Sequence, residues 1–290
     1  MVALFALTTA LLMGLADFGG GLLTRRAPAL TVVVASQGIA VTVLGAIVLA
    51  TAAWREAGPQ LWYAVAAGVL GPVALLCFYK ALALGPMGVV SPLGSLGVAV
   101  PVTVGLLLGE RPGPVQFAGI GVAVLGILMA GGPELRGAPV RRNTVALTCV
   151  AAFGFGAVMT LIAEASTSVT GLFLALFVQR AVNIAVGGTA LAVAARRGHR
   201  VLPADRDGGA GALRSALPLL AFVGLADVAS NGTYALAAQT GPVTVAAVLS
   251  HLYPVVTVLA ALIVLKERLR AVQATGAGLA LVGSVLLAGG

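Results

Sequence analysis

Charged side chains are scarce in this chain. Lys, Arg, Asp and Glu make up 9% of its 290 residues, whereas hydrophobic residues make up 60%. Soluble domains carry about 25% charged residues, so this composition excludes an ordinary soluble protein. No long polar stretch remains for a soluble domain on a single anchor. A membrane span needs about 20 residues, which leaves room for about ten spans.

The side chains that build catalytic and metal sites are also few. The two cysteines, Cys77 and Cys149, lie inside apolar stretches, which excludes a disulfide framework or a zinc ligand set. There are two histidines, and HExxH, CxxC and P-loop sequences are missing. We therefore expect no cofactor, no metal site, no enzymatic activity and no nucleotide-driven pump. The chain also lacks a polybasic arm, so we expect no nucleic-acid partner.

Apolar runs account for nearly all of the chain. A membrane β-barrel would show alternating polar and apolar residues, whereas these runs are apolar almost throughout. The sequence thus predicts an all-α integral membrane protein with ten transmembrane helices, at about 2–23, 29–52, 61–84, 87–108, 115–131, 144–163, 171–194, 215–238, 242–265 and 271–288.

The second half of the chain repeats the first. Glu110-Arg111, Gln116 and three following glycines recur 157 residues later as Glu267-Arg268, Gln273 and three glycines. Gly85-Pro86 likewise recurs as Gly241-Pro242. We expect one five-helix repeat at 1–131, a connecting loop at 132–143 and a second repeat at 144–290. Because five is odd, the repeats should have inverted topology, as in many secondary transporters whose substrate site lies between the halves. The alternative is that duplication merely built a larger hydrophobic body.

Basic residues are distributed unequally between the two sides of the predicted bundle. Fourteen of the 17 Lys and Arg residues fall in or beside the odd-numbered connections, and the other side holds only Arg55 and Arg111. Basic loops face the cytoplasm in membrane proteins. We therefore predict a multi-pass protein of the cell (inner) membrane with both termini outside.

Four ionisable residues lie inside the predicted spans, namely Asp17, Arg180, Asp227 and His251. Each such group costs about 2.5–3.5 kcal/mol to insert at a helix centre, so each is a candidate for function. Asp227 belongs to a stripe along one face of its helix, formed by Gly224, Asp227, Ser230, Asn231 and Tyr234. This stripe is either a wall of the substrate cavity or a structural hydrogen-bond network.

Arg180, with Asn183 three residues further on, needs a partner because a guanidinium cannot lose its proton. Two hypotheses follow: an ion pair with Asp227, or a carboxylate of the substrate. Asp17 is either a proton carrier or the partner of Arg25 or Arg26. We assign proton or cation coupling to Asp17 and Asp227, and we treat Arg180 and Asn183 as polar anchors.

The remaining candidates are aromatic residues, a histidine and prolines. Tyr79 and Tyr234 occupy similar places in the two halves and are interpreted as interfacial or cavity-lining side chains. His251 either lines the cavity or is hydrogen-bonded in the core. The predicted substrate-binding residues are Tyr79, Arg180, Asn183, Asn231, Tyr234 and His251. Proline interrupts helix hydrogen bonding, and the predicted hinges of the gating helices are Pro92, Pro101 and Pro254.

The order of these motifs resembles the drug/metabolite transporter superfamily, in particular its ten-helix EamA-type members. The resemblance rests on Met13-Gly14-Leu-Ala-Asp17-Phe18, the two Gly-Pro pairs, Leu-Gly-Glu110-Arg111-Pro112 and Leu-Lys-Glu267-Arg268-Leu. It implies export of small metabolites, amino acids or drugs through a central cavity by alternating access. We expect a small-molecule substrate, the lipid bilayer and protons as partners, with a monomer sufficient for function. An uncoupled facilitator and a non-transporting scaffold are the alternatives.

Overall fold

The computed structural model describes residues 1–24, 27–84, 95–130, 142–165, 168–198, 201, 210–265 and 271–289, and these residues form helices and turns without strands. The helices are α1 (Val2–Thr24), α2 (Ala29–Thr51), η1 (Ala53–Glu56), α3 (Leu61–Leu84), η2 (Ser95–Val98), α5 (Ala99–Leu107), α6 (Pro114–Ala130), α7 (Arg142–Glu164), α8 (Val169–Arg196), α9 (Ala210–Ser215), α10 (Leu217–Thr240), α11 (Val243–Ser250), α12 (Tyr253–Leu265) and α13 (Ala271–Gly289).

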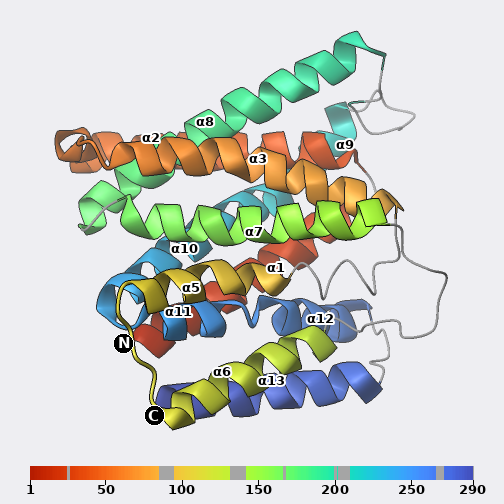
Figure 1. Ribbon diagram of the computed structural model, residues 1–290. Helices are drawn as coiled ribbons and strands as arrows, with labels where there is room; N and C mark the ends of the chain where they lie inside the picture. The colour runs from red at the N-terminus through yellow and green to blue at the C-terminus, as the bar shows by residue number, and fades with distance from the viewer. Residues whose placement is uncertain are drawn as a thin grey trace.

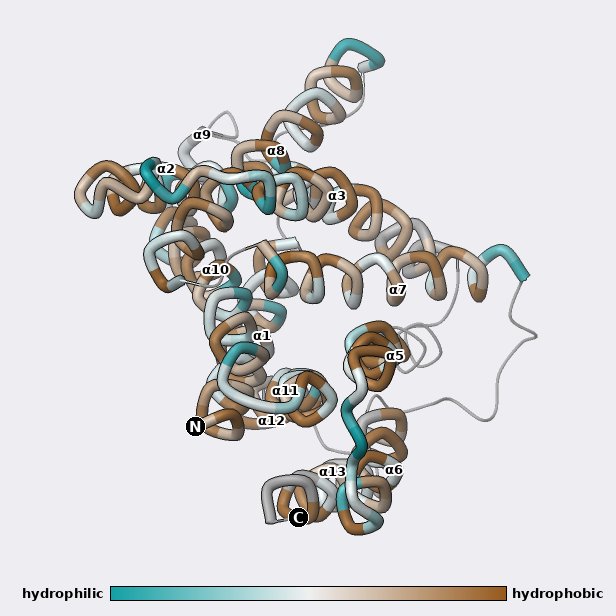
Figure 2. Tube along the Cα trace, turned by 60° about the vertical axis from the view of Figure 1, so that its left-hand side comes forward, coloured by the Kyte–Doolittle hydropathy of each residue, from teal (hydrophilic) through white to brown (hydrophobic). Residues whose placement is uncertain are grey.

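Within the described residues, six helices are long and apolar enough to cross a membrane: α1, α2, α3, α7, α8 and α10. Shorter apolar helices cover Leu96–Leu107, Pro114–Gly126, Val243–Thr257 and Ala274–Gly283. In Figure 2, hydrophobic residues run along the helices, and hydrophilic residues gather at such places as the outer ends of α7 and α8. The all-helical membrane class is therefore confirmed, while the count of ten spanning helices stays a prediction.

The two halves of the chain interlock rather than standing side by side. α1 packs against α10 and α12, α7 packs against α3 and α5, α2 packs against α8, and α6 packs against α13. Each of these contacts joins a helix of the first half to one of the second half. Figure 1 also shows that α1 begins at the end of the bundle where the N-terminus is marked, whereas α7 begins at the opposite end. Equivalent helices thus run in opposite directions.

Glycines let the two halves approach closely at equivalent points. A Cβ at Gly126 of α6 would overlap the backbone of Ala280 in α13, and a Cβ at Gly283 would overlap the backbone of Ala123. Gly126 and Gly283 are 157 residues apart, and so are Ala123 and Ala280, which is the shift of the sequence repeat. Small residues permit such close helix contacts in membranes, so the repeat encodes this symmetric crossing.

The sequence predicts one helix over residues 242–265, whereas the structure divides this run into two helices. α11 ends at Ser250 and α12 begins at Tyr253, with a turn at His251 and Leu252. Proline at 254 has no N–H to donate to the carbonyl of Ser250, four residues earlier, and its ring would clash with that carbonyl. The helix therefore breaks one turn before this proline.

The sequence also predicts one helix over residues 87–108, whereas the described part of this run contains two short helices, η2 and α5. η2 precedes α5, and Pro101 is a buried residue in the first turn of α5. Proline is tolerated in a first turn, because the N–H it lacks has no partner within the helix. The carbonyl of Gly97, four residues before Pro101, lies against Gly156 of α7. Residues 85–94, with the predicted hinge Pro92, lie outside the described residues.

One end of the bundle holds the N-terminus, η1, the turn at Gly109 and the turn at Gly241, and we call it the termini end (Figure 1). Both tryptophans, Trp54 and Trp62, are exposed near this end, with Tyr63 beside them. Tryptophan and tyrosine favour the membrane–water interface. Their position is therefore consistent with a membrane boundary at the level of η1.

Candidate functional site

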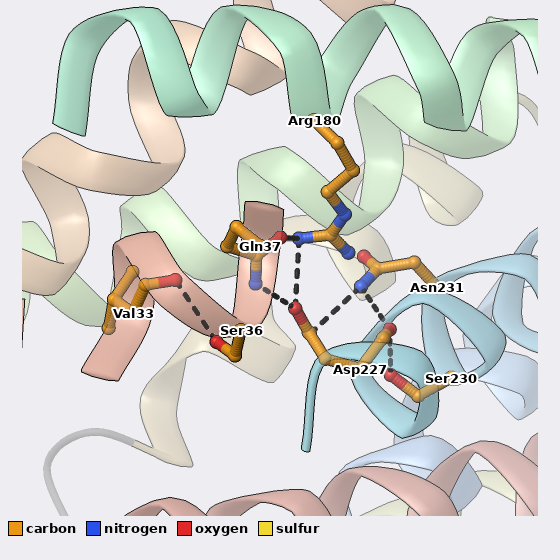
Figure 3. Close-up of polar contacts among 7 residues, drawn as sticks. All are labelled: Val33, Ser36, Gln37, Arg180, Asp227, Ser230 and Asn231. Carbon is orange, nitrogen blue, oxygen red and sulfur yellow. Dashed lines mark hydrogen bonds and ion pairs between the residues drawn. The ribbon is translucent and has the colours of Figure 1, made fainter. Parts of the chain in front are cut away.

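A buried ion pair joins α8 to α10 in the interior of the bundle. Arg180 Nη1 lies 2.8 Å from Asp227 Oδ2, and the side chains are 4% and 28% exposed, respectively. Figure 3 shows the Arg180 side chain extending from α8 toward Asp227. A charge this deeply buried is tolerated only when it is paired. The ion pair, which was one of two hypotheses for Arg180, is thus present in the structure.

Gln37 of α2 completes this cluster by contacting both charged groups. Its Oε1 accepts a hydrogen bond from Arg180 Nη1 at 3.0 Å, and its Nε2 donates to Asp227 Oδ2 at 2.8 Å. The three side chains come from three helices and form a closed triangle (Figure 3). We call Gln37, Arg180 and Asp227 the polar cluster. Gln37 was not among the residues singled out from the sequence.

Close helix contacts on either side of the cluster bring its residues together. A Cβ at Gly224 of α10 would overlap the carbonyl of Ser36 in α2, and a Cβ at Gly68 of α3 would lie 2.6 Å from the carbonyl of Gln179 in α8. Ser36 and Gln179 directly precede Gln37 and Arg180, respectively. Any larger residue would separate these helices, so the two glycines set the position of the cluster.

The neighbours of Asp227 on α10 fix its backbone. Asn231 Nδ2 donates to the Asp227 carbonyl at 2.8 Å and to its Oδ1 at 3.3 Å, and Ser230 Oγ donates to the same carbonyl at 2.7 Å. Three residues of the helical stripe predicted from the sequence, Asp227, Ser230 and Asn231, therefore form a hydrogen-bond network. Asn183, one turn beyond Arg180, is 9% exposed, and its Nδ2 would lie 3.4 Å from a Cβ at Gly71 of α3.

Arg180 has donors that the polar cluster does not use. Its Nε and Nη2 are buried and find no hydrogen-bond partner in the part of the chain that the structure describes. A buried guanidinium N–H without a partner costs free energy. The Nε–Nη2 edge of a guanidinium matches the two oxygens of a carboxylate. This edge can therefore accept an acidic group.

Asp17 lies on α1, and its side chain is exposed. It makes no ion pair or hydrogen bond with a described residue, and Arg25 and Arg26, its predicted alternative partners, lie outside those residues. The Asp17 carboxylate is within electrostatic range of Asp227 and of Tyr253. Two acidic groups from opposite repeats are thus neighbours, one paired with Arg180 and the other without a described partner.

The other predicted site residues lie apart from the polar cluster. Tyr234 is fully buried among Ala6, Val248 and other core residues, and its hydroxyl has no partner in the described part. His251 is 3% exposed, and its Nδ1 is 2.8 Å from the Ala247 carbonyl oxygen. The side chains of Tyr79 in α3 and Pro254 in α12 lie outside the described residues.

Glu110 belongs to the repeated Glu-Arg motif, and in the structure it makes a contact between the repeats. Its Oε2 accepts a hydrogen bond from the backbone N–H of Thr244 at 2.9 Å, and its Oε1 accepts one from Val243. The equivalent residue Glu267 lies outside the described residues. No local sequence signal marks the contact, because it joins residues more than 130 positions apart.

Interlocked apolar helices around one buried ion pair define a polytopic membrane protein with a polar site in its interior. The family model "EamA-like transporter family" matches residues 1–132 and again 142–289. The chain therefore belongs to the EamA-like transporter family. This places it in the drug/metabolite transporter superfamily, as the resemblance in its motifs implied, and makes it a membrane transporter of small molecules.

A similar fold occurs in a solved structure described only as "Crystal structure of protein". The chain is 19% identical to it, the match covers 99% of this chain and 98% of that one, and the TM-score is 0.75. At this identity the likeness supports the fold alone. A search of curated proteins finds no match.

Proposed function

We propose that this transporter is a secondary transporter that exports small metabolites, amino acids or drug-like compounds by alternating access. The observation that carries the proposal is the polar cluster, which joins α2 of the first repeat to α8 and α10 of the second. An inert hydrophobic body needs no buried charges, and ionisable groups inside spans are costly. A site between inverted repeats is where alternating access acts.

Substrates with a carboxylate fit this site best. The unpaired Nε–Nη2 edge of Arg180 supplies two parallel donors, and the amides of Asn183 and Asn231 lie one turn from Arg180 and Asp227, respectively. We propose that Tyr79, Tyr234 and His251, which lie apart from the cluster, line another part of the substrate path. Export of an organic acid or an amino acid is therefore the specific form of the proposal.

Protons are the proposed coupling ion, carried by Asp17 and Asp227. Protonation of Asp227 would neutralise the acid partner of Arg180 and leave the guanidinium available to the substrate. Asp17, which has no described partner and lies near Asp227, would exchange the proton with water. Substrate binding and proton binding would thus both act on Arg180.

The predicted topology gives the protein an orientation in the membrane. We propose ten spanning helices in two repeats, 1–131 and 144–290, in the cell membrane, with the basic connections in the cytoplasm and both termini outside. Pro92, Pro101 and Pro254 are proposed hinges. A single chain contains both halves of the site, so a monomer is sufficient.

Two experiments test this function. An untargeted comparison of metabolites released by cells with and without the protein should show specific excess of one or a few acidic metabolites. The purified protein in liposomes should then move these metabolites faster when a proton gradient is imposed. Flux that ignores the gradient would make the protein an uncoupled facilitator, and absence of flux for every released metabolite would refute transport.

A further inference from the structure

Glu110 lies in the turn between α5 and α6, at the termini end. It follows Gly109, whose φ of +94° falls in the left-handed region that glycine adopts at little cost. The backbone N–H of Glu110 donates to the carbonyl of Gly105 at 3.1 Å, which closes the turn onto α5. The local backbone of Glu110 is therefore fixed to the first repeat.

The side chain of Glu110, in contrast, binds the second repeat. Its two carboxylate oxygens accept hydrogen bonds from the backbone N–H groups of Val243 and Thr244, the first two residues of α11. The first N–H groups of a helix have no partner inside it. The residue before α11 is Pro242, and it makes no side-chain capping bond. Glu110 therefore supplies the cap that α11 lacks, and its negative charge suits the helix N-terminus.

The surroundings of this cap are closely packed. A Cβ at Gly105 would lie 2.7 Å from Glu110 Oε2 and 3.0 Å from Thr244 Cγ2, and Gly241 touches Val2 at the start of α1. Thr244 itself is 1% exposed. The helices α5 and α11 thus meet at this carboxylate, and α1 packs against α11 beside it.

The cap is also connected to the polar cluster along α10. Tyr234, within electrostatic range of Glu110, lies one turn beyond Asn231 on the stripe that begins with Asp227 and its neighbours. An opening of the bundle between α5 and α11 at the termini end moves α11 away from the turn of the first repeat, because Glu110 joins the two. That movement requires the two hydrogen bonds to break.

We propose that the contact between the Glu110 carboxylate and the N-terminus of α11 is the gate that closes the termini end, and that it breaks each time the site opens there. This proposal rests on the alternating access proposed above. Glu110 is a positioning residue in this view, because it acts on the position of α11 and does not touch the substrate.

Pulsed electron–electron resonance between two spin labels measures this opening directly. The labels go on Arg111→Cys and Thr240→Cys, both exposed and on opposite sides of the contact, in a chain with Cys77→Ser and Cys149→Ser. A helix cap contributes enough that Glu110→Ala should raise the open-to-closed ratio about five-fold. Glu110→Gln should raise it less, because the amide oxygen still accepts one bond. Glu164→Gln, an exposed acid at the end of α7 without a hydrogen bond or ion pair to a described residue, is the control and should leave the ratio unchanged.

Val243→Pro tests the same contact from the other side. Proline is favoured in the first position of a helix, so this variant keeps α11 and removes one N–H that Glu110 binds. It should shift the ratio in the same direction as Glu110→Ala and add little when combined with it. It also serves if Glu110→Ala does not fold.

The proposal is overturned if the folded variants keep the wild-type distance distribution. Because the readout is a distance, it separates the gate from the proposed function. If the protein shows no flux but Glu110→Ala still increases opening, the gate proposal stands and the transport proposal fails. If the protein transports but neither variant changes the measured distances, the transport proposal stands and the gate proposal fails.

Discussion

Gln37 and Arg180 occupy equivalent positions in the two repeats and are hydrogen-bonded to each other. Gly68 of α3 packs on Gln179 of α8, and Gly224 of α10 packs on Ser36 of α2. These matching contacts make Ser36 equivalent to Gln179, 143 residues later in the chain. The same shift makes Gln37 equivalent to Arg180. The bond between them, 3.0 Å from Nη1 to Oε1, therefore crosses the axis that relates the halves. The position equivalent to Asp227 is Gly71, 156 residues earlier. Both charges of the cluster thus belong to the second repeat.

Replacing Asp227 should reduce stability more than replacing Arg180. Asp227→Asn leaves the buried Arg180 charged and unpaired, and breaking such a pair typically costs about 3–5 kcal/mol. Arg180→Gln leaves Asp227, which is 28% exposed and keeps its hydrogen bonds from Gln37 and Asn231, so its cost should be smaller. Thermal unfolding in detergent should rank the proteins as wild type, Arg180→Gln and Asp227→Asn in decreasing order. Equal melting temperatures for the two variants would contradict the asymmetry.

Asp17 should matter for coupling and little for stability. Its side chain is exposed and has no partner among the described residues, so Asp17→Asn removes no known bond and relieves the repulsion from Asp227. We expect an unchanged melting temperature together with loss of the response to a proton gradient in liposomes. Asp227→Asn should also abolish that response. If both variants transport with a normal response to the proton gradient, the coupling assignment is wrong.

The membrane class and most helix positions could be predicted from the sequence, and the ion pair was one of two hypotheses that it left for Arg180. The run predicted at 61–84 coincides with α3, because a long apolar stretch determines a span by length and hydropathy alone. Arg180 and Asp227 could be paired because charges inside spans are few and must be satisfied. These features depend on insertion energies, which are local properties of the chain.

Features that depend on tertiary packing escaped prediction. Gln37 is uncharged, so no insertion cost marks it, and its equivalence to Arg180 emerges only from the glycine contacts. The break at His251, by contrast, has a local cause in Pro254, which was predicted as a hinge, although the run 242–265 was predicted as one continuous helix. Glu110 caps a helix of the other repeat, which no spacing within its own turn reveals.

The crossing of α6 and α13 should tolerate substitution at one glycine and not at the other. Gly126 abuts the backbone of Ala280, whereas Gly121 on the same helix has open space where a Cβ would stand. Gly126→Leu should therefore separate the helices and destabilise the protein by about 1–3 kcal/mol, as overpacking does. Gly121→Leu should be neutral or slightly stabilising, because glycine is a poor helix former. Chemical unfolding of the two variants in detergent measures the difference, and similar losses for both would refute the packing argument.

The equivalence of Gln37 and Arg180 predicts that the buried charge can move to the other repeat. Both side chains already contact Asp227 Oδ2, at 2.8 Å in each case. In the double variant Gln37→Arg/Arg180→Gln, the new arginine can pair with Asp227 from α2, while the new glutamine bridges from α8. We expect the double variant to recover most of the stability lost in Arg180→Gln, whereas Gln37→Arg alone places two cations beside one acid and should be the least stable of the three. Melting temperatures of the three proteins, with wild type as reference, measure this. The two positions are not interchangeable if the double variant loses as much stability as the two single variants lose together. In that case the cluster depends on the particular helix that carries the charge.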